Sequence, residues 1–475
     1  MIMQSGGLKK WGITLIPLLV FIIGFTLFSS SFIYANEDGE NEIKLNLSQV
    51  VELALAKESN VLDAQDNFEI AQSNLRLAQK GKGFNPIVEV SGDLSLVGEA
   101  DSNLLVSVSD SLALNETSSK LADQFQQADL EVKKAQNTLE NAQENAKLKA
   151  ITAYFEVLKA EWTKELAQQT LEQAQILQSD LENQYQLGMA SSLDLLQAQQ
   201  TVENSRINLD QSEKSLLLKK QQLNQMIGYA LNTPLVLAQD FSYQPLGEEL
   251  DQFTTGALSY HTDLKDLLWQ KEIETITLKQ IERDRRAKVH LIGSYVEENY
   301  SVRFDLQSPD WVLDWKLTGQ LAETEESFST TTSQDPFTPS STGWGVGLEV
   351  TWIPFDGGIS QEQKQQQQII LAQIERKLQA LPDSITLEVF EAYNLFLQSD
   401  QAALTAQLEK QIAEETYRLQ QQQYQAGFIT DRTLKESELA REKANLNYQK
   451  AIYNYILSKA QLYQVAGKKI IIEEL

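Results

Sequence analysis

The feature that most constrains the fold is a long stretch of heptad spacing without glycine or proline. No glycine lies between Gly98 and Gly188, and no proline lies between Pro86 and Pro234. Small and apolar residues recur there at alternating steps of four and three, first over 125–146 and again over 153–185. This spacing predicts long helices that pack side by side, and the many alanines on the seam allow close approach.

The same design occurs twice in the chain. "YQLGMASSLDLL" begins at Tyr185 and "YQAGFITDRTLK" begins at Tyr424, 239 positions later. In each copy one helical pattern ends at Tyr-Gln-x-Gly and another follows, which predicts a helical hairpin that turns at Gly188 or at Gly427. The same offset aligns "AYFEVL" at 153–158 with "AYNLFL" at 392–397. Landmarks shared at one offset favour an internal duplication over the generic similarity of coiled coils.

These landmarks divide the chain into a first repeat over 36–240 and a second over 241–475. In the earlier part of the repeats the best offset is shorter, near 203 positions, so the second repeat contains an insertion of roughly 40 residues. The sequence leaves open whether residues 301–343 of this insertion add strands or form a surface loop.

Between the helices the apolar period changes to two. Apolar and polar residues alternate at 87–97 and 104–114 in the first repeat, and within 289–354 in the second. Such alternation is typical of a membrane barrel strand with an apolar outside and a wet inside. Two strands per repeat give about four per chain, whereas a membrane barrel needs about eight or more. The chain must therefore share its barrel with other copies of itself.

The first 35 residues have the pattern of a secretory signal peptide. Lys9 and Lys10 precede an apolar run from Ile13 to Phe28, and small residues follow up to Ala35. The run is short for a spanning helix. Elsewhere no apolar stretch is long enough for a membrane helix, so a mature protein that enters a membrane would do so by strands.

Charge and composition exclude several classes of function. The chain carries 40 basic and 66 acidic side chains, a net charge of −26, which disfavours nucleic acid as a partner. It has no cysteine and two histidines, so we expect no metal site and no cofactor. No catalytic motif is present, and we do not expect an enzyme.

Several motifs together resemble the TolC-like outer-membrane efflux protein family. "WIPFDGG" at 352–358 matches the family's strand-to-helix segment, and its carrying residues are Pro354, Phe355, Asp356, Gly357 and Gly358. The two Tyr-Gln-x-Gly stretches resemble the family's hairpin turns. The resemblance implies a mainly α fold, in which a homotrimeric 12-stranded outer-membrane β-barrel continues into a long periplasmic α-helical coiled-coil barrel. The number of three chains comes from this resemblance alone.

The resemblance also implies a function and partners. Such a protein is the exit duct of a tripartite efflux or type I secretion system and does no bond chemistry. It contacts outer-membrane lipid, a periplasmic adaptor (membrane fusion) protein and an inner-membrane pump of RND or ABC type. The sequence does not identify the substrate. The alternative is a periplasmic coiled-coil scaffold or adaptor-like protein with no channel, which explains the heptads but neither the strands nor "WIPFDGG".

In this family the hairpin turns form the closed periplasmic aperture. The positions that match its gate are Tyr185, Asp194, Tyr424, Thr433 and Glu436, and Thr433 stands where the family has an acid. Asp194 and Glu436 from three chains would line a constriction that favours cations. Both acids are also what a solvated first helical turn prefers, so this simpler role stays open.

Overall fold

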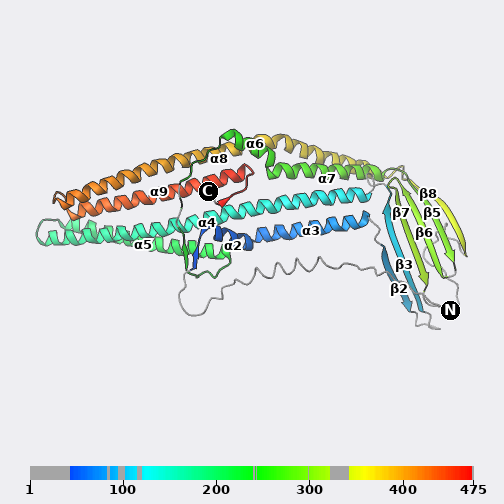
Figure 1. Cartoon of the computed structure of the whole chain (residues 1–475), viewed down its shortest axis with the longest axis horizontal. Helices are drawn as coiled ribbons and strands as arrows, with labels where there is room; N and C mark the ends of the chain where they lie inside the picture. The colour runs from blue at the N-terminus through cyan, green and yellow to red at the C-terminus, as the bar shows by residue number, and fades with distance from the viewer. Residues whose placement is uncertain are drawn as a thin grey trace, which may run out of the picture. The chain divides into compact units, whose positions relative to one another are not determined.

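The computed structural model describes residues 43–82, 86–94, 102–114, 120–238, 241, 243–297, 299–320 and 342–472. The expected signal peptide over 1–35 lies outside the described residues. The chain separates into Met1–Ile43 and a second unit, Lys44–Leu475. The second unit consists of paired long helices and an antiparallel sheet (Figure 1).

The two halves of this unit contain helices of matching length. In the first half they are α2 (Leu47–Lys57), α3 (Ser59–Lys82), α4 (Lys120–Gln186) and α5 (Ser192–Ile227). In the second half they are α6 (Leu250–Tyr260), α7 (Thr262–Asp284), α8 (Ile359–Gln425) and α9 (Asp431–Val465). Helices α4 and α8 have 67 residues each. At about 1.5 Å per residue, each is on the order of 100 Å long, as the heptad spacing predicts.

The sheet contains six strands in the order β2-β3-β7-β6-β5-β8, and all neighbours are antiparallel. The strands are β2 (Ile87–Leu94), β3 (Ser102–Ala113), β5 (Lys288–Glu297), β6 (Tyr300–Ser308), β7 (Val312–Gln320) and β8 (Gly343–Thr351). The sheet therefore has six strands where two strands per repeat predict about four, and residues 301–320, which the sequence leaves open, add strands. The two additional strands are β6 and β7, and residues 321–341 lie outside the described residues.

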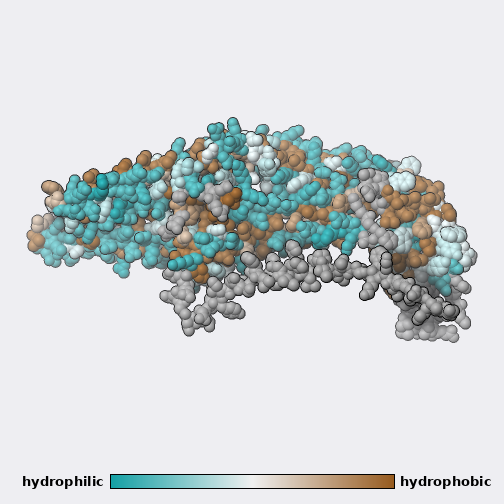
Figure 2. All heavy atoms as spheres, in the orientation of Figure 1, coloured by the Kyte–Doolittle hydropathy of each residue, from teal (hydrophilic) through white to brown (hydrophobic). Residues whose placement is uncertain are grey.

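The sheet has one apolar and one polar face. One cross-strand row of the apolar face consists of Val88, Val108, Leu317, Val302, Tyr295 and Trp344. The edge strand β8 leaves Trp344 and Val346 78% and 79% exposed, and Figure 2 shows hydrophobic side chains gathered over the strands. The opposite face carries mostly Ser, Asp, Lys, Arg and His side chains, together with the buried Ile292, Val296 and Val312. This is the alternation that the sequence predicts for a barrel wall.

Aromatic residues form the core between α4 and α9. Tyr453 stacks on Phe155 and Trp162, with ring centroids 4.4 Å and 5.1 Å apart. The buried Tyr154 donates a hydrogen bond from its hydroxyl to the Ala238 carbonyl at 2.5 Å. This core joins the first long hairpin, α4–α5, to the second, α8–α9.

Candidate functional site

The two long hairpins turn at the same relative position. Gly188 has φ 75° and Gly427 has φ 77°, in the left-handed region that favours glycine. At each turn the amide after the glycine donates to a carbonyl five residues earlier, Met189 to Gln184 and Phe428 to Gln423, both at 2.8 Å. These bonds cap α4 and α8 in the Schellman manner. The matching geometry explains why the chain contains the Tyr-Gln-x-Gly stretch twice.

Asp194 is part of a helix cap at the first turn. The Ser191 hydroxyl caps α5 by accepting from the Asp194 amide at 3.2 Å, and the Asp194 carboxylate accepts from the Ser191 amide at 2.9 Å and from its hydroxyl at 2.6 Å. The hydrogen bonds from the Ser191 side chain and backbone lower the pKa of Asp194. The carboxylate therefore has a structural role whether or not it lines an aperture.

At the second turn Thr433 occupies the position that matches Asp194. Thr430 caps α9 by accepting from the Thr433 amide at 3.3 Å, and Thr433 contributes a hydroxyl where the first turn has the Asp194 carboxylate. Three residues further on, Glu436 pairs with Arg432 at 2.9 Å, and Asp431 pairs with Lys435 at 3.1 Å. All four side chains are about half exposed, so these pairs are weak. The start of α9 is thus locally neutral, whereas Asp194 has no such basic partner among the described residues.

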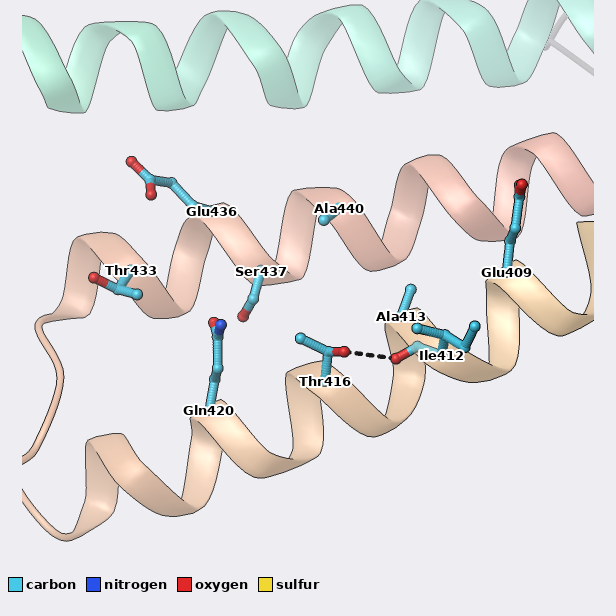
Figure 3. Close-up of a pocket in the computed structure, with 9 residues that line it drawn as sticks. All are labelled: Glu409, Ile412, Ala413, Thr416, Gln420, Thr433, Glu436, Ser437 and Ala440. Atoms are coloured by element: carbon cyan, nitrogen blue, oxygen red, sulfur yellow. Dashed lines mark hydrogen bonds between the residues drawn. The ribbon is translucent and has the colours of Figure 1, made fainter.

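Glu436 borders two hollows near the second turn. A groove of about 440 Å³ between α8 and α9 is lined by Glu409, Ile412, Ala413, Thr416, Gln420, Thr433, Glu436, Ser437 and Ala440 (Figure 3). A second hollow of about 200 Å³ is lined by residues of α4 and α5 together with Arg432, Lys435 and Glu436. The amide of Gln173 on α4 donates to the Lys435 carbonyl at 2.6 Å and joins the two hairpins beside this hollow.

The candidate gate residues lie near the ends of the two long hairpins, two on the first hairpin and three on the second. Tyr185 and Tyr424 lie one turn before the glycines and are 46% and 41% exposed. Asp194 accepts both capping bonds through one carboxylate oxygen, Oδ2, and Thr433 and Glu436 lie on α9. A constriction formed by these side chains would need neighbouring copies of the chain.

The "WIPFDGG" segment connects strand β8 to helix α8. The Asp356 carboxylate accepts from the amides of Gly358 at 3.0 Å and Ser360 at 2.8 Å, and from the Ser360 hydroxyl. These bonds, led by that of the Ser360 side chain, lower the pKa of Asp356. Gly357 and Gly358 have φ 71° and 90° and provide the left-handed turn before the helix. Pro354 lies just after the strand, and Phe355 is exposed.

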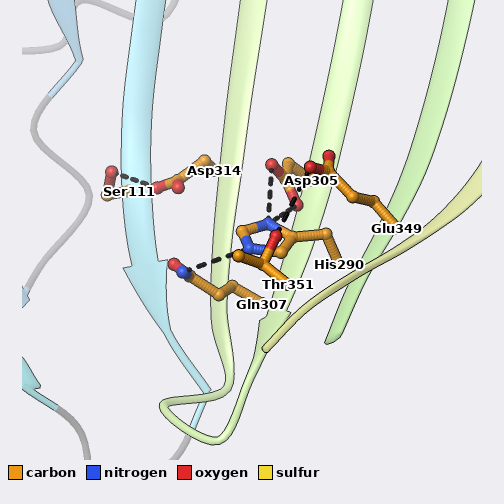
Figure 4. Close-up of polar contacts among 7 residues, drawn as sticks. All are labelled: Ser111, His290, Asp305, Gln307, Asp314, Glu349 and Thr351. Atoms are coloured by element: carbon orange, nitrogen blue, oxygen red, sulfur yellow. Dashed lines mark hydrogen bonds and ion pairs between the residues drawn. The ribbon is translucent and has the colours of Figure 1, made fainter. Parts of the chain in front are cut away.

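The sheet carries a polar cluster of His290, Asp305 and Gln307 that was not predicted from the sequence (Figure 4). His290 Nδ1 lies 3.1 Å from an oxygen of Asp305, and the Gln307 amide nitrogen lies 3.4 Å from His290 Nε2. The signal was the alternation in "YSVRFDLQS" over 300–308, which places Asp305 and Gln307 on one face. Within the described ranges, no group of three or more His, Cys, Asp or Glu side chains is arranged to hold a metal ion.

No helix among the described residues combines the length and hydrophobicity that a membrane crossing requires. A comparison with curated proteins found no match. Solved structures do match. The Campylobacter jejuni CmeC outer membrane channel superposes with a TM-score of 0.63 at 14% identity, covering 89% of this chain and 85% of that one. The Vibrio cholerae outer membrane protein VceC gives 0.61 at 15% identity, with 89% and 96% covered.

The open state of the Neisseria gonorrhoeae MtrE outer membrane channel superposes with a TM-score of 0.55 at 15% identity, and the match covers 90% of each chain. At these identities the structures establish a shared fold. A family model described as outer membrane efflux protein matches residues 50–229 and 304–468, well over half of the sequence. Together with the paired long helices and the two-faced sheet, this match shows that the chain belongs to the outer membrane efflux protein family.

Proposed function

We propose that this protein is the subunit of a homotrimeric exit duct in the outer membrane, which passes substrates from a pump and its adaptor to the cell exterior. The observation that carries the proposal is a sheet with an exposed apolar face, a mostly polar opposite face and edge strands β2 and β8 that each pair on one side only within the described part of the chain. Lipid does not tolerate open strand edges, so such a sheet must close with other copies. Strand β8 continues through "WIPFDGG" into α8, which gives the barrel a direct extension by helices.

Matching helix lengths support the internal duplication. The pairs α2 and α6 have 11 residues each, α3 and α7 have 24 and 23, and α5 and α9 have 36 and 35. One chain would then supply two pseudo-equivalent hairpins to a ring, and three chains would supply six. The helices reach on the order of 100 Å from the sheet, a length suited to crossing a periplasm.

The hairpin ends are the proposed gate and the proposed docking end for the adaptor. Asp194 and Glu436 from three chains would form two acidic rings, and Tyr185 and Tyr424 would lie just behind the turns. Glu436 is paired with Arg432, and Thr433 carries no charge. The ring of Asp194 side chains would therefore carry the stronger negative charge of the two. The pump would be of RND or ABC type, and efflux and type I secretion both fit this arrangement.

Cell fractionation combined with mass measurement tests the proposal. The duct predicts a detergent-requiring, heat-modifiable trimer in the outer-membrane fraction, with the segment 1–35 removed. The alternative periplasmic scaffold predicts a soluble protein without detergent dependence. For the gate, conductance of the Asp194→Asn/Glu436→Gln variant in planar bilayers is compared with wild type. Unchanged conductance and unchanged cation preference would remove both acids from the gate.

A further inference from the structure

The hairpin β6–β7 is an insertion that leaves the rest of the sheet intact. It lies between β3 and β5, and each of its strands is antiparallel to its neighbours. Removing an antiparallel pair leaves β3 and β5 antiparallel to each other, so β2-β3-β5-β8 is a regular sheet by itself. In the sequence, β6 and β7 lie between β5 and β8. In the sheet, β5 and β8 pair directly with each other.

The register shows that both strands of this hairpin are integral parts of the sheet and do not form a surface loop. Strand β7 pairs with β3 along Leu105–Ala113, and β6 pairs with β5 along Val289–Glu297. Val302 and Leu306 of β6 share cross-strand rows with large apolar residues of both β5 and β7, and Phe304 lies opposite Trp315 of β7. Matching alternation on both sides fixes the register, because a slip by one residue would place the apolar set on the polar face.

Polar side chains connect the hairpin to the neighbouring strand on each side, β3 and β5 (Figure 4). The Ser111 hydroxyl of β3 donates to the Asp314 carboxylate of β7, and His290 of β5 contacts Asp305 of β6 at 3.1 Å. On this same face Arg303 lies opposite Lys316, and Asp305 lies opposite Asp314. The inner face of the inserted strands is therefore polar and joined to the neighbouring strands.

The turn of the hairpin is fixed to the helices. The Arg283 guanidinium at the end of α7 contacts Asp123 at the start of α4, and it contacts Asp310 in the β6–β7 turn at 3.3 Å. The Leu114 amide, directly after β3, donates to the Trp311 carbonyl at 2.8 Å. The three ionic side chains are only 11–13% exposed. The inserted hairpin is thus built into the junction between sheet and helices.

We propose that the β6–β7 hairpin widens the barrel, so that three copies close an eighteen-stranded wall around a broad, water-filled lumen. The inference rests on the trimeric duct proposed above. With strands about 4.8 Å apart and tilted by about 40°, eighteen strands give a backbone diameter of about 36 Å, against about 24 Å for twelve. The hairpin supplies a third of that wall and lines the lumen with Arg303, Asp305, Asp314 and Lys316.

Distances between spin labels measure this diameter. Because the chain contains no cysteine, Val346→Cys on the exposed face of β8 provides a single labelling site per chain. Backbone sites on the three copies would lie about 30 Å apart in an eighteen-stranded ring and about 20 Å apart in a twelve-stranded ring. The matched control joins β5 to β8 directly by replacing residues 298–342 with Asn-Gly, and it should shorten the measured distance by about 10 Å.

The result that overturns the inference is a trimer with label distances that fit twelve strands in the full chain. Should the deletion variant fail to assemble, Val90→Cys on β2 gives an independent measurement in the full chain, and both sites must fit the same wide ring. Native mass spectrometry on the same samples counts the chains. A count other than three refutes the trimeric duct, whereas a trimer with the short distance refutes only the widened barrel.

Discussion

The junction of sheet and helices depends on Arg283, which pairs with two carboxylates from distant parts of the chain. Replacing it by glutamine removes the cation that Asp123 and Asp310 share, in a site where the three side chains are only 11–13% exposed. Breaking a buried ion pair from one side costs about 3–5 kcal/mol. Because some solvent reaches this site, we expect Arg283→Gln to lower the free energy of unfolding by about 3 kcal/mol, the lower end of that range.

The assay is a guanidinium titration of the detergent-solubilised protein, followed by the circular dichroism of the helices. The matched control is Arg418→Gln, because Arg418 pairs with Glu415 at 2.8 Å while the side chains are 65% and 62% exposed. That change should cost less than about 1 kcal/mol. Adding Asp123→Asn and Asp310→Asn to Arg283→Gln should recover part of the loss, because no unpaired carboxylate remains. Equal stability of Arg283→Gln and Arg418→Gln would show that the Arg283 ion pairs do not stabilise the junction.

Three further predictions concern the turns and the core. Gly427→Ala should lower the free energy of unfolding by about 1 kcal/mol, because Gly427 has a φ of 77° that alanine adopts only with strain, although no atom lies within 4 Å of the added Cβ. The matched control is Gly247→Ala, whose added Cβ also meets no atom within 4 Å. Because Gly247 has no positive φ, this change should lower the free energy of unfolding less in the same titration. The capping of α5 by Asp194 should be pH-dependent: its pKa is lowered in the folded protein, so the contribution is present above the ordinary aspartate pKa of about 3.9 and is lost as the pH falls through the lower folded value. Thermal midpoints of wild type and Asp194→Ala should therefore differ at neutral pH and converge in acid; a constant difference would contradict this role. Tyr453→Phe should be neutral or stabilising by about 1 kcal/mol, because the buried hydroxyl has no hydrogen-bond partner among the described residues, whereas Tyr455→Phe should destabilise by a similar amount through loss of its 2.6 Å bond to the Gln244 carbonyl.

The long helices could be predicted from the sequence because their signal is local and repeated. Heptad spacing over 125–185 gave α4, and the glycines after each Tyr-Gln gave both turns. The salt bridge between Arg432 and Glu436 follows from their four-residue spacing on a helix. These features need no knowledge of what lies elsewhere in the chain.

The hairpin β6–β7 is a case that the sequence leaves open, because residues 301–343 could add strands or form a surface loop. Counting two strands per repeat assumes that the halves match throughout, whereas the second half contains an additional antiparallel pair. The segment from Trp311 reads as one alternating strand, but Trp311 itself has φ 49° and belongs to the turn after Pro309. The proline was the available signal for that turn.

Contacts between distant segments could not be predicted at all. Arg283 lies 160 positions from Asp123, and no local pattern links them. The same holds for the aromatic core, where Tyr453 of α9 stacks on Phe155 of α4. Such pairs depend on how the halves pack, which a single sequence does not specify.

The decisive measurement for an outer-membrane duct is single-channel recording in planar bilayers. Purified, heat-modifiable trimers should insert and give discrete conductance steps, and Asp194→Asn/Glu436→Gln should change the size or the cation preference of these steps. Folded wild-type protein that yields no conductance, and that stays soluble without detergent as a single chain, would show that the protein is not such a duct.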